Sequence, residues 1–107
     1  MRPVNRVTPI RKSSAQIAKF LDVDIDFDLT FSGISHSTSD IEPGDLFIAI
    51  AGTKIHGSAF AEKARELGAL AILTDKQGYA QASQYLPTIT LDNLRFILGD
   101  FAAWFYN

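Results

Sequence analysis

The clearest hydrophobic pattern in the chain is a run of six apolar residues, 46–51, that stands between turn-forming residues. Pro43-Gly44-Asp45 precedes the run, and Gly52 follows it. A short apolar run that is partly β-branched or aromatic and bounded by turns is typical of a buried strand. We therefore predict a buried strand that begins near Asp45 and ends before Gly52.

After this strand the pattern changes to helical spacing. Gly68 stands where helices commonly end, and a second apolar run at 69–74 predicts another strand. The helix expected between them, at 58–67, places four apolar residues on one face, namely Phe60, Ala61, Ala64 and Leu67. This order puts a helix N-terminus at the carboxyl end of a buried strand, which is where α/β folds bind ligands.

The other segments complete an α/β fold. They predict a helix at 14–21 capped by Ser13 or Ser14, a strand at 29–34, a loop and short helix within 76–85, a strand at 87–91, and a last helix capped by Asp92. We expect a small mixed or parallel sheet flanked by helices. It would form one domain over residues 13–107, preceded by an extended arm over residues 1–12.

The last helix carries an apolar stripe that we expect to face the core. Phe96 and Tyr106 fall away from this stripe, so we expect exposed aromatic surface there, suited to a contact with another domain or a second copy. The stripe itself consists of Leu94, Ile97, Leu98, Phe101, Trp104 and Phe105.

Four aspartates alternate with apolar residues over 22–28, in either a short strand or a turn. Their spacing lacks the glycine and the terminal glutamate of an EF-hand loop. We therefore favour a solvated acidic edge over a divalent-cation site.

Composition narrows the function classes. The chain has 107 residues, of which 47% are hydrophobic, enough for one core, and its formal net charge of -2 comes without a basic stripe for nucleic acid. No cysteine is present, which excludes disulfides and fits a reducing compartment. The apolar runs are too short to cross a bilayer. We expect a cytoplasmic protein that binds neither nucleic acid nor membrane.

Two polar loops follow apolar strands, and each contains one of the two histidines, His36 and His56. The first is Ser35-His36-Ser37-Thr38-Ser39, and the second covers residues 53–58. Hydroxyls, backbone N–H groups and imidazoles at one sheet edge suit a nucleotide or a sugar. The alternative is an ordinary turn in which Ser37 or Ser39 caps locally and the histidines are solvated.

Catalytic motifs are missing from the sequence. It has no Gly-x-x-x-x-Gly-Lys-Ser/Thr phosphate loop, no Gly-x-Ser-x-Gly elbow and no His-Glu-x-x-His pair. We therefore expect no catalytic residue, no metal site and no catalysis by this chain alone.

The chain resembles the N-terminal domain of the Mur ligases at three places. These are residues 43–49, the glycine that follows the strand predicted there, Gly52, and the Gly-Ala-x-Ala-x-Leu pattern at 68–73. These ATP-dependent enzymes add amino acids to the UDP-N-acetylmuramoyl peptide of the bacterial cell wall. The end of the chain, 94–106, is similar to the Leu-Arg…Phe-Tyr helix that leads into the ATPase domain of the tripeptide synthetases in this family. The resemblance covers most of the chain.

The resemblance implies that the domain binds the UDP end of UDP-N-acetylmuramoyl-L-alanyl-D-glutamate and holds no cofactor. ATP and Mg²⁺ would belong to a central ATPase domain absent here, which would also be its partner. One alternative is the same domain of the ligase that adds D-alanyl-D-alanine. Another is a freestanding module that binds protein through its strand edges.

The family's motif also implies a set of contact residues. Thr38 takes the place of a serine whose hydroxyl contacts the UDP moiety, and Ser37 and Ser39 replace the usual Asp and Arg. We expect Lys54 and the N–H groups of residues 57–59 to offset the missing arginine. Lys54-Ile55-His56-Gly57 stands where Phe-Asp-Gly-His is common. The expected substrate-binding residues are His36, Thr38, Thr53, Lys54, Ile55, His56 and Gly57.

Overall fold

The computed structural model describes residues 11–107. The expected arm at 1–12 lies almost entirely outside the described residues, but Lys12 at its end belongs to strand β1 (Lys12–Ser13). This strand pairs antiparallel with β2 (Thr30–Phe31). Together they form a small ribbon beside the main sheet.

The main sheet has four parallel strands in the order β3-β4-β5-β6. The strands are β3 (Gly33–Ser35), β4 (Asp45–Ala49), β5 (Ala71–Thr74) and β6 (Thr88–Thr90). The predicted α/β class is confirmed, and the main sheet is parallel rather than mixed. Parallel strands place all of their carboxyl ends at one edge, and this positions the site described below.

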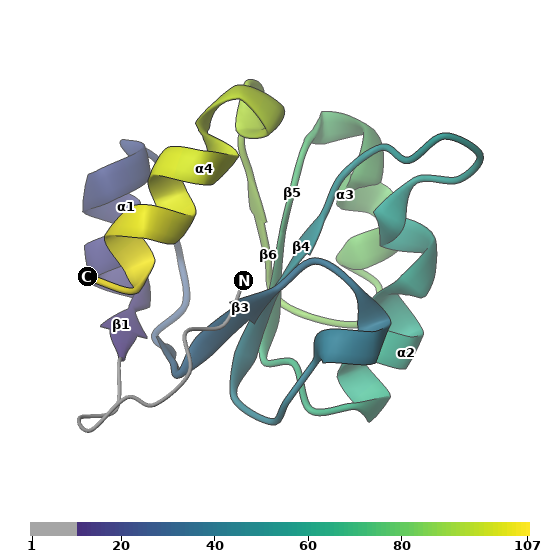
Figure 1. Cartoon of the computed structure of the whole chain (residues 1–107), viewed down its shortest axis with the longest axis horizontal. Helices are drawn as coiled ribbons and strands as arrows, with labels where there is room; N and C mark the ends of the chain where they lie inside the picture. The colour runs from purple at the N-terminus through teal and green to yellow at the C-terminus, as the bar shows by residue number, and fades with distance from the viewer. Residues whose placement is uncertain (1–10) are drawn as a thin grey trace.

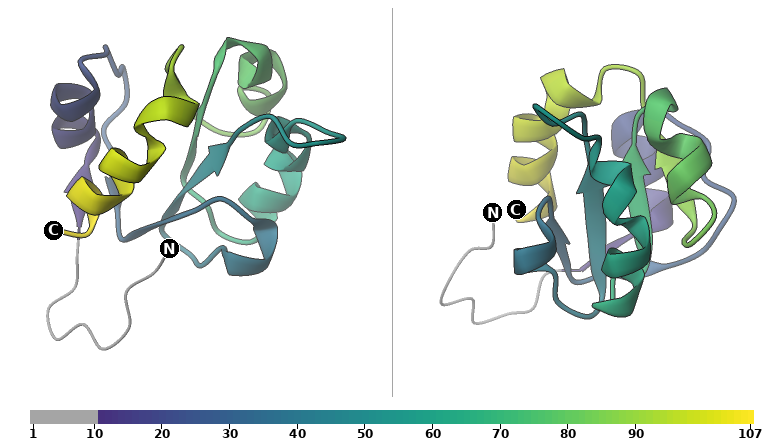
Figure 2. Two further views of the ribbon diagram at one scale, coloured as in Figure 1. Left: turned by 45° about the horizontal axis from the view of Figure 1, so that its top comes forward. Right: turned by 90° about the vertical axis from the view of Figure 1, so that its right-hand side faces the viewer.

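Helices cover both faces of this sheet (Figure 1). Helices α1 (Ser14–Leu21) and α4 (Leu94–Phe105) pack on one face, and α2 (Ala61–Glu66) and α3 (Lys76–Ala82) on the other. Two further views in Figure 2 show the same three layers. Alternate residues of β4 supply both cores: Leu46 and Ile48 face α1 and α4, whereas Phe47 and Ala49 face α2 and α3.

Three boundaries differ from the predictions. The strand expected at 29–34 is split, because the chain changes partner at Ser32: β2 pairs with β1, and β3 pairs with β4. The helix expected at 58–67 begins as a 3-10 turn, η2 (Gly57–Phe60), before α2. The prediction that Asp92 caps the last helix is wrong, since Asn93 holds the N-cap position without a side-chain bond.

The first helix follows its prediction closely. Ser13 is its N-cap, and the Ser13 hydroxyl accepts a hydrogen bond from the backbone N–H of Gln16 at 3.2 Å. The Gln16 side chain in turn accepts from the Ser13 N–H at 2.9 Å. This reciprocal capping box explains why the helix begins at Ser14.

The stripe of the last helix is confirmed as a core face. Leu94, Phe101 and Phe105 are buried, and the remaining stripe residues pack against them. Phe96 is 87% exposed, as expected. The prediction that Tyr106 is exposed is wrong. Its ring packs against the core, and its hydroxyl accepts a hydrogen bond from the Ile34 N–H at 3.0 Å, which fastens α4 to β3.

The acidic segment at 22–28 has no regular secondary structure, and its four aspartates are exposed while Val23, Ile25 and Phe27 pack on the core. Within residues 11–107 no group of metal-ligating side chains is arranged to hold a metal ion. The same residues include no helix with the length and apolar character needed to cross a membrane.

Candidate functional site

Two loops meet at the carboxyl edge of the parallel sheet. Strands β3 and β4 are neighbours, with Ser35 opposite Phe47. We call residues 36–40, which follow β3, the β3 loop, and residues 50–57, which follow β4, the β4 loop. Because the two strands run in the same direction, both loops leave the sheet at the same edge.

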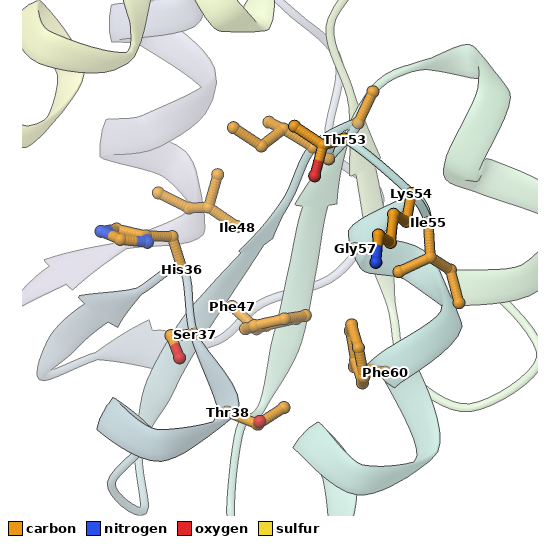
Figure 3. Close-up of a pocket in the computed structure, with 13 residues that line it drawn as sticks. His36, Ser37, Thr38, Phe47, Ile48, Thr53, Lys54, Ile55, Gly57 and Phe60 are labelled. Atoms are coloured by element: carbon orange, nitrogen blue, oxygen red, sulfur yellow. The ribbon is translucent and has the colours of Figure 1, made fainter.

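A pocket of about 430 Å³ lies between these two loops (Figure 3). This volume is within the range found for small-molecule sites. Six of the seven predicted site residues line it, and His56 does not. The six are His36, Thr38, Thr53, Lys54, Ile55 and Gly57.

The floor of the pocket is apolar. Phe47 and Ile48 line it from opposite faces of β4, and Phe60 from η2 lies at its side. Sequence reasoning missed these three residues as lining. The spacing placed Phe60 on a core-facing stripe, but the 3-10 turn leaves it 43% exposed. The alternation in β4 was visible in the sequence, although it does not reveal which face of the sheet continues into the pocket.

The β3 loop is organised by local serine bonds. The Ser37 hydroxyl accepts from the Ser39 N–H at 3.3 Å and lies 2.9 Å from the Ser39 hydroxyl. Ser37 is therefore the cap of the 3-10 turn η1 (Thr38–Asp40), as the turn interpretation proposed. This turn leaves Thr38 and His36 on the pocket lining, so local capping and a binding role are compatible.

The β4 loop is closed by backbone hydrogen bonds. The Gly52 N–H donates to the Ile55 carbonyl at 3.1 Å, and the Gly57 N–H donates to the Ile50 carbonyl at 2.8 Å. Arg95 at the start of α4 donates to the Ala51 carbonyl, which ties the last helix to the same loop. Thr53, Lys54 and Ile55 project from this closed loop and remain exposed.

The expectation that the N–H groups of residues 57–59 help to bind a diphosphate is wrong. The N–H groups of residues 57–59 are already bonded, because Gly57 donates to Ile50, Ser58 to the His56 imidazole at 3.0 Å, and Ala59 to the His56 carbonyl at 3.0 Å. They are therefore not free to bind an anion. Within the described part of the chain, Lys54 is the cationic side chain on the lining.

The arrangement suits a ligand with a flat apolar part and a polar or anionic part. Phe60 and Ile55 offer exposed apolar surface, with Phe47 packed beneath them, whereas Thr38, Thr53 and Lys54 offer hydrogen bonds and a positive charge. Among residues 11–107 no carboxylate lines the pocket, and His36 is the other titratable side chain on the lining. These groups can bind and orient a ligand, but they do not form a nucleophile with an adjacent base.

Comparison with known proteins identifies the family to which the chain is similar. Residues 30–106 match the family described as "Mur ligase family, catalytic domain". The chain is 35% identical over 103 residues to UDP-N-acetylmuramoyl-L-alanyl-D-glutamate--2,6-diaminopimelate ligase of Streptomyces coelicolor, which covers 92% of this chain and 20% of that protein. It is 37% identical over 82 residues to UDP-N-acetylmuramyl-tripeptide synthetase of Deinococcus radiodurans, covering 77% of this chain and 16% of that protein.

The chain thus spans about a fifth of the length of the first of these relatives. The family match covers the pocket, both loops and the last helix, and so includes every element that builds the site. This chain belongs to the Mur ligase family.

Proposed function

We propose that this chain binds the UDP end of a UDP-N-acetylmuramoyl peptide for a ligase of peptidoglycan synthesis. The observation that carries the proposal is the convergence of the β3 and β4 loops on one pocket that combines an aromatic floor with hydroxyls and Lys54. The relatives support the same substrate class, since their names specify UDP-N-acetylmuramoyl-L-alanyl-D-glutamate or a UDP-N-acetylmuramyl tripeptide.

In this proposal Phe60 and Ile55 provide the apolar surface for the uracil ring, and Lys54 lies near the diphosphate. The Thr38 and Thr53 hydroxyls serve as hydrogen-bond partners for the nucleotide. His36 at the rim contacts the part of the ligand that leaves the pocket. His56 takes no direct part, because it lies outside the lining.

The remaining steps of the reaction are proposed to belong to other domains. ATP and Mg²⁺ would act in an ATPase domain, which would be the partner of this one, and this chain would hold no cofactor. The enzyme would work in the cytoplasm. The relatives described above favour a tripeptide synthetase over the ligase that adds D-alanyl-D-alanine.

The affinity for UDP alone is expected to be weak. This chain would make only part of the contacts to the full substrate, and association has its own entropy cost. We expect a dissociation constant of about 0.1–1 mM, which corresponds to about 4–5.5 kcal/mol. Calorimetry with UDP and with ATP tests the proposal. Preference for UDP supports it, whereas equal affinity for ATP or no binding at millimolar concentration refutes it.

Thr38→Val is expected to weaken UDP binding by about 1 kcal/mol, because one hydrogen bond to the ligand is lost while side-chain shape is kept. The measurement is the dissociation constant by calorimetry. Thr30→Val is the matched control, since Thr30 is exposed on β2 and does not line the pocket. Equal UDP dissociation constants for the two variants would mean that Thr38 does not contact the ligand.

Lys54→Gln is expected to raise the dissociation constant for UDP about threefold and to leave that for uridine unchanged. An exposed charge contributes up to about 1 kcal/mol, and uridine has no phosphate for it to attract. The difference should shrink as salt concentration rises. Lys63→Gln on α2 is the control, because it also removes an exposed lysine. A similar loss of uridine affinity would contradict a diphosphate role for Lys54.

A further inference from the structure

His56 is the one predicted site residue that lies outside the pocket lining, and it makes two specific bonds instead. Its Nδ1 accepts from the Ser58 N–H at 3.0 Å, and its Nε2 lies 2.9 Å from Oδ1 of Asp75. The His56 side chain is only 10% exposed. Its ring therefore faces α3 rather than the ligand space.

These two bonds determine where the imidazole carries its proton. A backbone N–H can only donate, so Nδ1 must be the acceptor in the bond from Ser58. In the neutral ring the hydrogen is then on Nε2, which donates to Asp75. The Ser58 hydroxyl takes no part, because it donates to the Gln81 side chain at 3.4 Å. A nucleophile–base pair is therefore not formed here.

Asp75 joins this contact to the rest of the fold. It follows strand β5, caps α3, and accepts from the Gly78 N–H through the same Oδ1 at 3.0 Å. One carboxylate oxygen thus receives a bond from the β4 loop and another from the first turn of α3. The adjacent Thr74 hydroxyl donates to the Ala49 carbonyl at 2.7 Å, which links β5 to the end of β4.

The packing around this contact leaves little freedom. A Cβ at Gly78 would lie 2.6 Å from Cε1 of His56 and 2.3 Å from Oγ1 of Thr74. Only glycine therefore lets α3 approach the imidazole this closely. His56 is also paired with Ala51 across the base of the β4 loop. Any movement of the His56 backbone would carry Thr53, Lys54 and Ile55 with it.

We propose that His56 and Asp75 are positioning residues that fix the β4 loop in the shape that forms the pocket wall. The pair fastens the last part of the loop to α3, while the Gly52 and Gly57 backbone bonds close the rest. The part of the inference that concerns UDP affinity rests on the proposed function. The part that concerns loop shape does not.

The test measures amide hydrogen exchange by NMR and UDP affinity by calorimetry on the same proteins. In His56→Phe we expect exchange at Gly52, Gly57 and Ser58 to become about tenfold faster relative to Ile72 in β5. The UDP dissociation constant should rise about fivefold. A uniform acceleration that includes Ile72 would mean that His56 only stabilises the fold, and unchanged loop exchange would mean that it does nothing; either result overturns the inference.

Two further variants separate the two bonds. Asp75→Asn keeps an Oδ1 that can accept from both His56 and Gly78, so loop exchange should stay within twofold of the wild type. His56→Asn keeps an acceptor for the Ser58 N–H but is too short for Asp75, so Ser58 should stay protected while Gly52 and Gly57 exchange faster. Gln77→Ala is the control, because Gln77 is exposed in the same turn of α3. Asp75→Asn behaving like His56→Phe would contradict the assigned proton position.

The two proposals fail in distinguishable ways. If the wild type does not bind UDP but the exchange pattern appears, the proposed function is wrong and the positioning role stands. If the wild type binds UDP and His56→Phe changes neither loop exchange nor affinity, the positioning role is wrong and the proposed function stands.

Discussion

Replacing Phe47 by alanine is expected to lower the free energy of unfolding by about 3–5 kcal/mol, the usual cost of truncating a buried phenylalanine. Phe47 is 2% exposed and packs with Ala49, Ala61, Ala64 and Ile72 between the sheet and the second helical layer. The three alanines among these neighbours are too small to fill the space left by the ring. Because domains of this size are stable by about 5–15 kcal/mol, the loss is a large part of the total.

The same substitution should also weaken UDP binding, since Phe47 packs beneath the exposed lining of the pocket and supports it. Urea denaturation gives the stability change, and calorimetry gives the affinity. Phe96→Ala makes the identical chemical change at a residue that is 87% exposed, and it should alter stability by no more than about 0.5 kcal/mol. A Phe47 variant as stable as the Phe96 variant would contradict the described core.

Replacing Gly68 by alanine is expected to cost about 2–4 kcal/mol. Gly68 ends α2 with φ +105, a conformation that other residues rarely adopt, and a Cβ there would lie 2.8 Å from Cα of Pro43. Relief of this clash would pull apart the hydrogen bond from the Gly44 N–H to the Gly68 carbonyl, 3.0 Å long, at the entrance to β4. Thermal denaturation measures the effect.

Gly99→Ala is the matched control for this prediction. Gly99 lies within α4, and a Cβ there would meet nothing within 4 Å. Alanine is a better helix former than glycine, so this variant should be more stable by about 0.5–1 kcal/mol. The change in stability is therefore expected to have opposite signs for Gly68→Ala and Gly99→Ala. Destabilisation of similar size at both would show that the contact between Gly68 and the Pro43 turn is not the cause.

Much of the fold could be predicted from the sequence because local signals and tertiary packing agree in most elements. The apolar run that forms β4, the glycine that ends α2 and the capping serine of α1 each act over a few residues. The stripe of α4 has a regular period that matches its burial. Such local patterns are where sequence reasoning is strongest.

One error arises where a distant residue decides the structure, and another where an unusual local cap does. Tyr106 lies off the helical stripe, yet Ile34 supplies a backbone partner from the edge strand of the main sheet. Phe60 fits a core face by spacing, but the His56 cap starts a 3-10 turn that directs it to the pocket. The Tyr106 contact joins residues 72 apart, so no local pattern contains it, whereas the His56 cap is local but histidine is not among the usual capping residues.

In the candidate site, too, some features could be predicted from the sequence and others could not. Its two loops were predictable, since both follow apolar strands that end at one edge of a parallel sheet. The direction of the His56 side chain, toward α3, was not predictable, because it depends on Asp75, which lies nineteen residues further along the chain. The N–H groups of residues 57–59 are likewise occupied by partners that only the folded loop brings close.

The most direct test of the central claim is an NMR titration of the ¹⁵N-labelled chain with UDP-N-acetylmuramoyl-L-alanyl-D-glutamate, with ATP as the comparison ligand. If the pocket between the β3 and β4 loops binds the UDP end, amide shifts will cluster at residues 36–39 and 53–58 and will be absent or much smaller with ATP. Shifts centred elsewhere on the molecule, or an equal response to ATP, would contradict the proposed site.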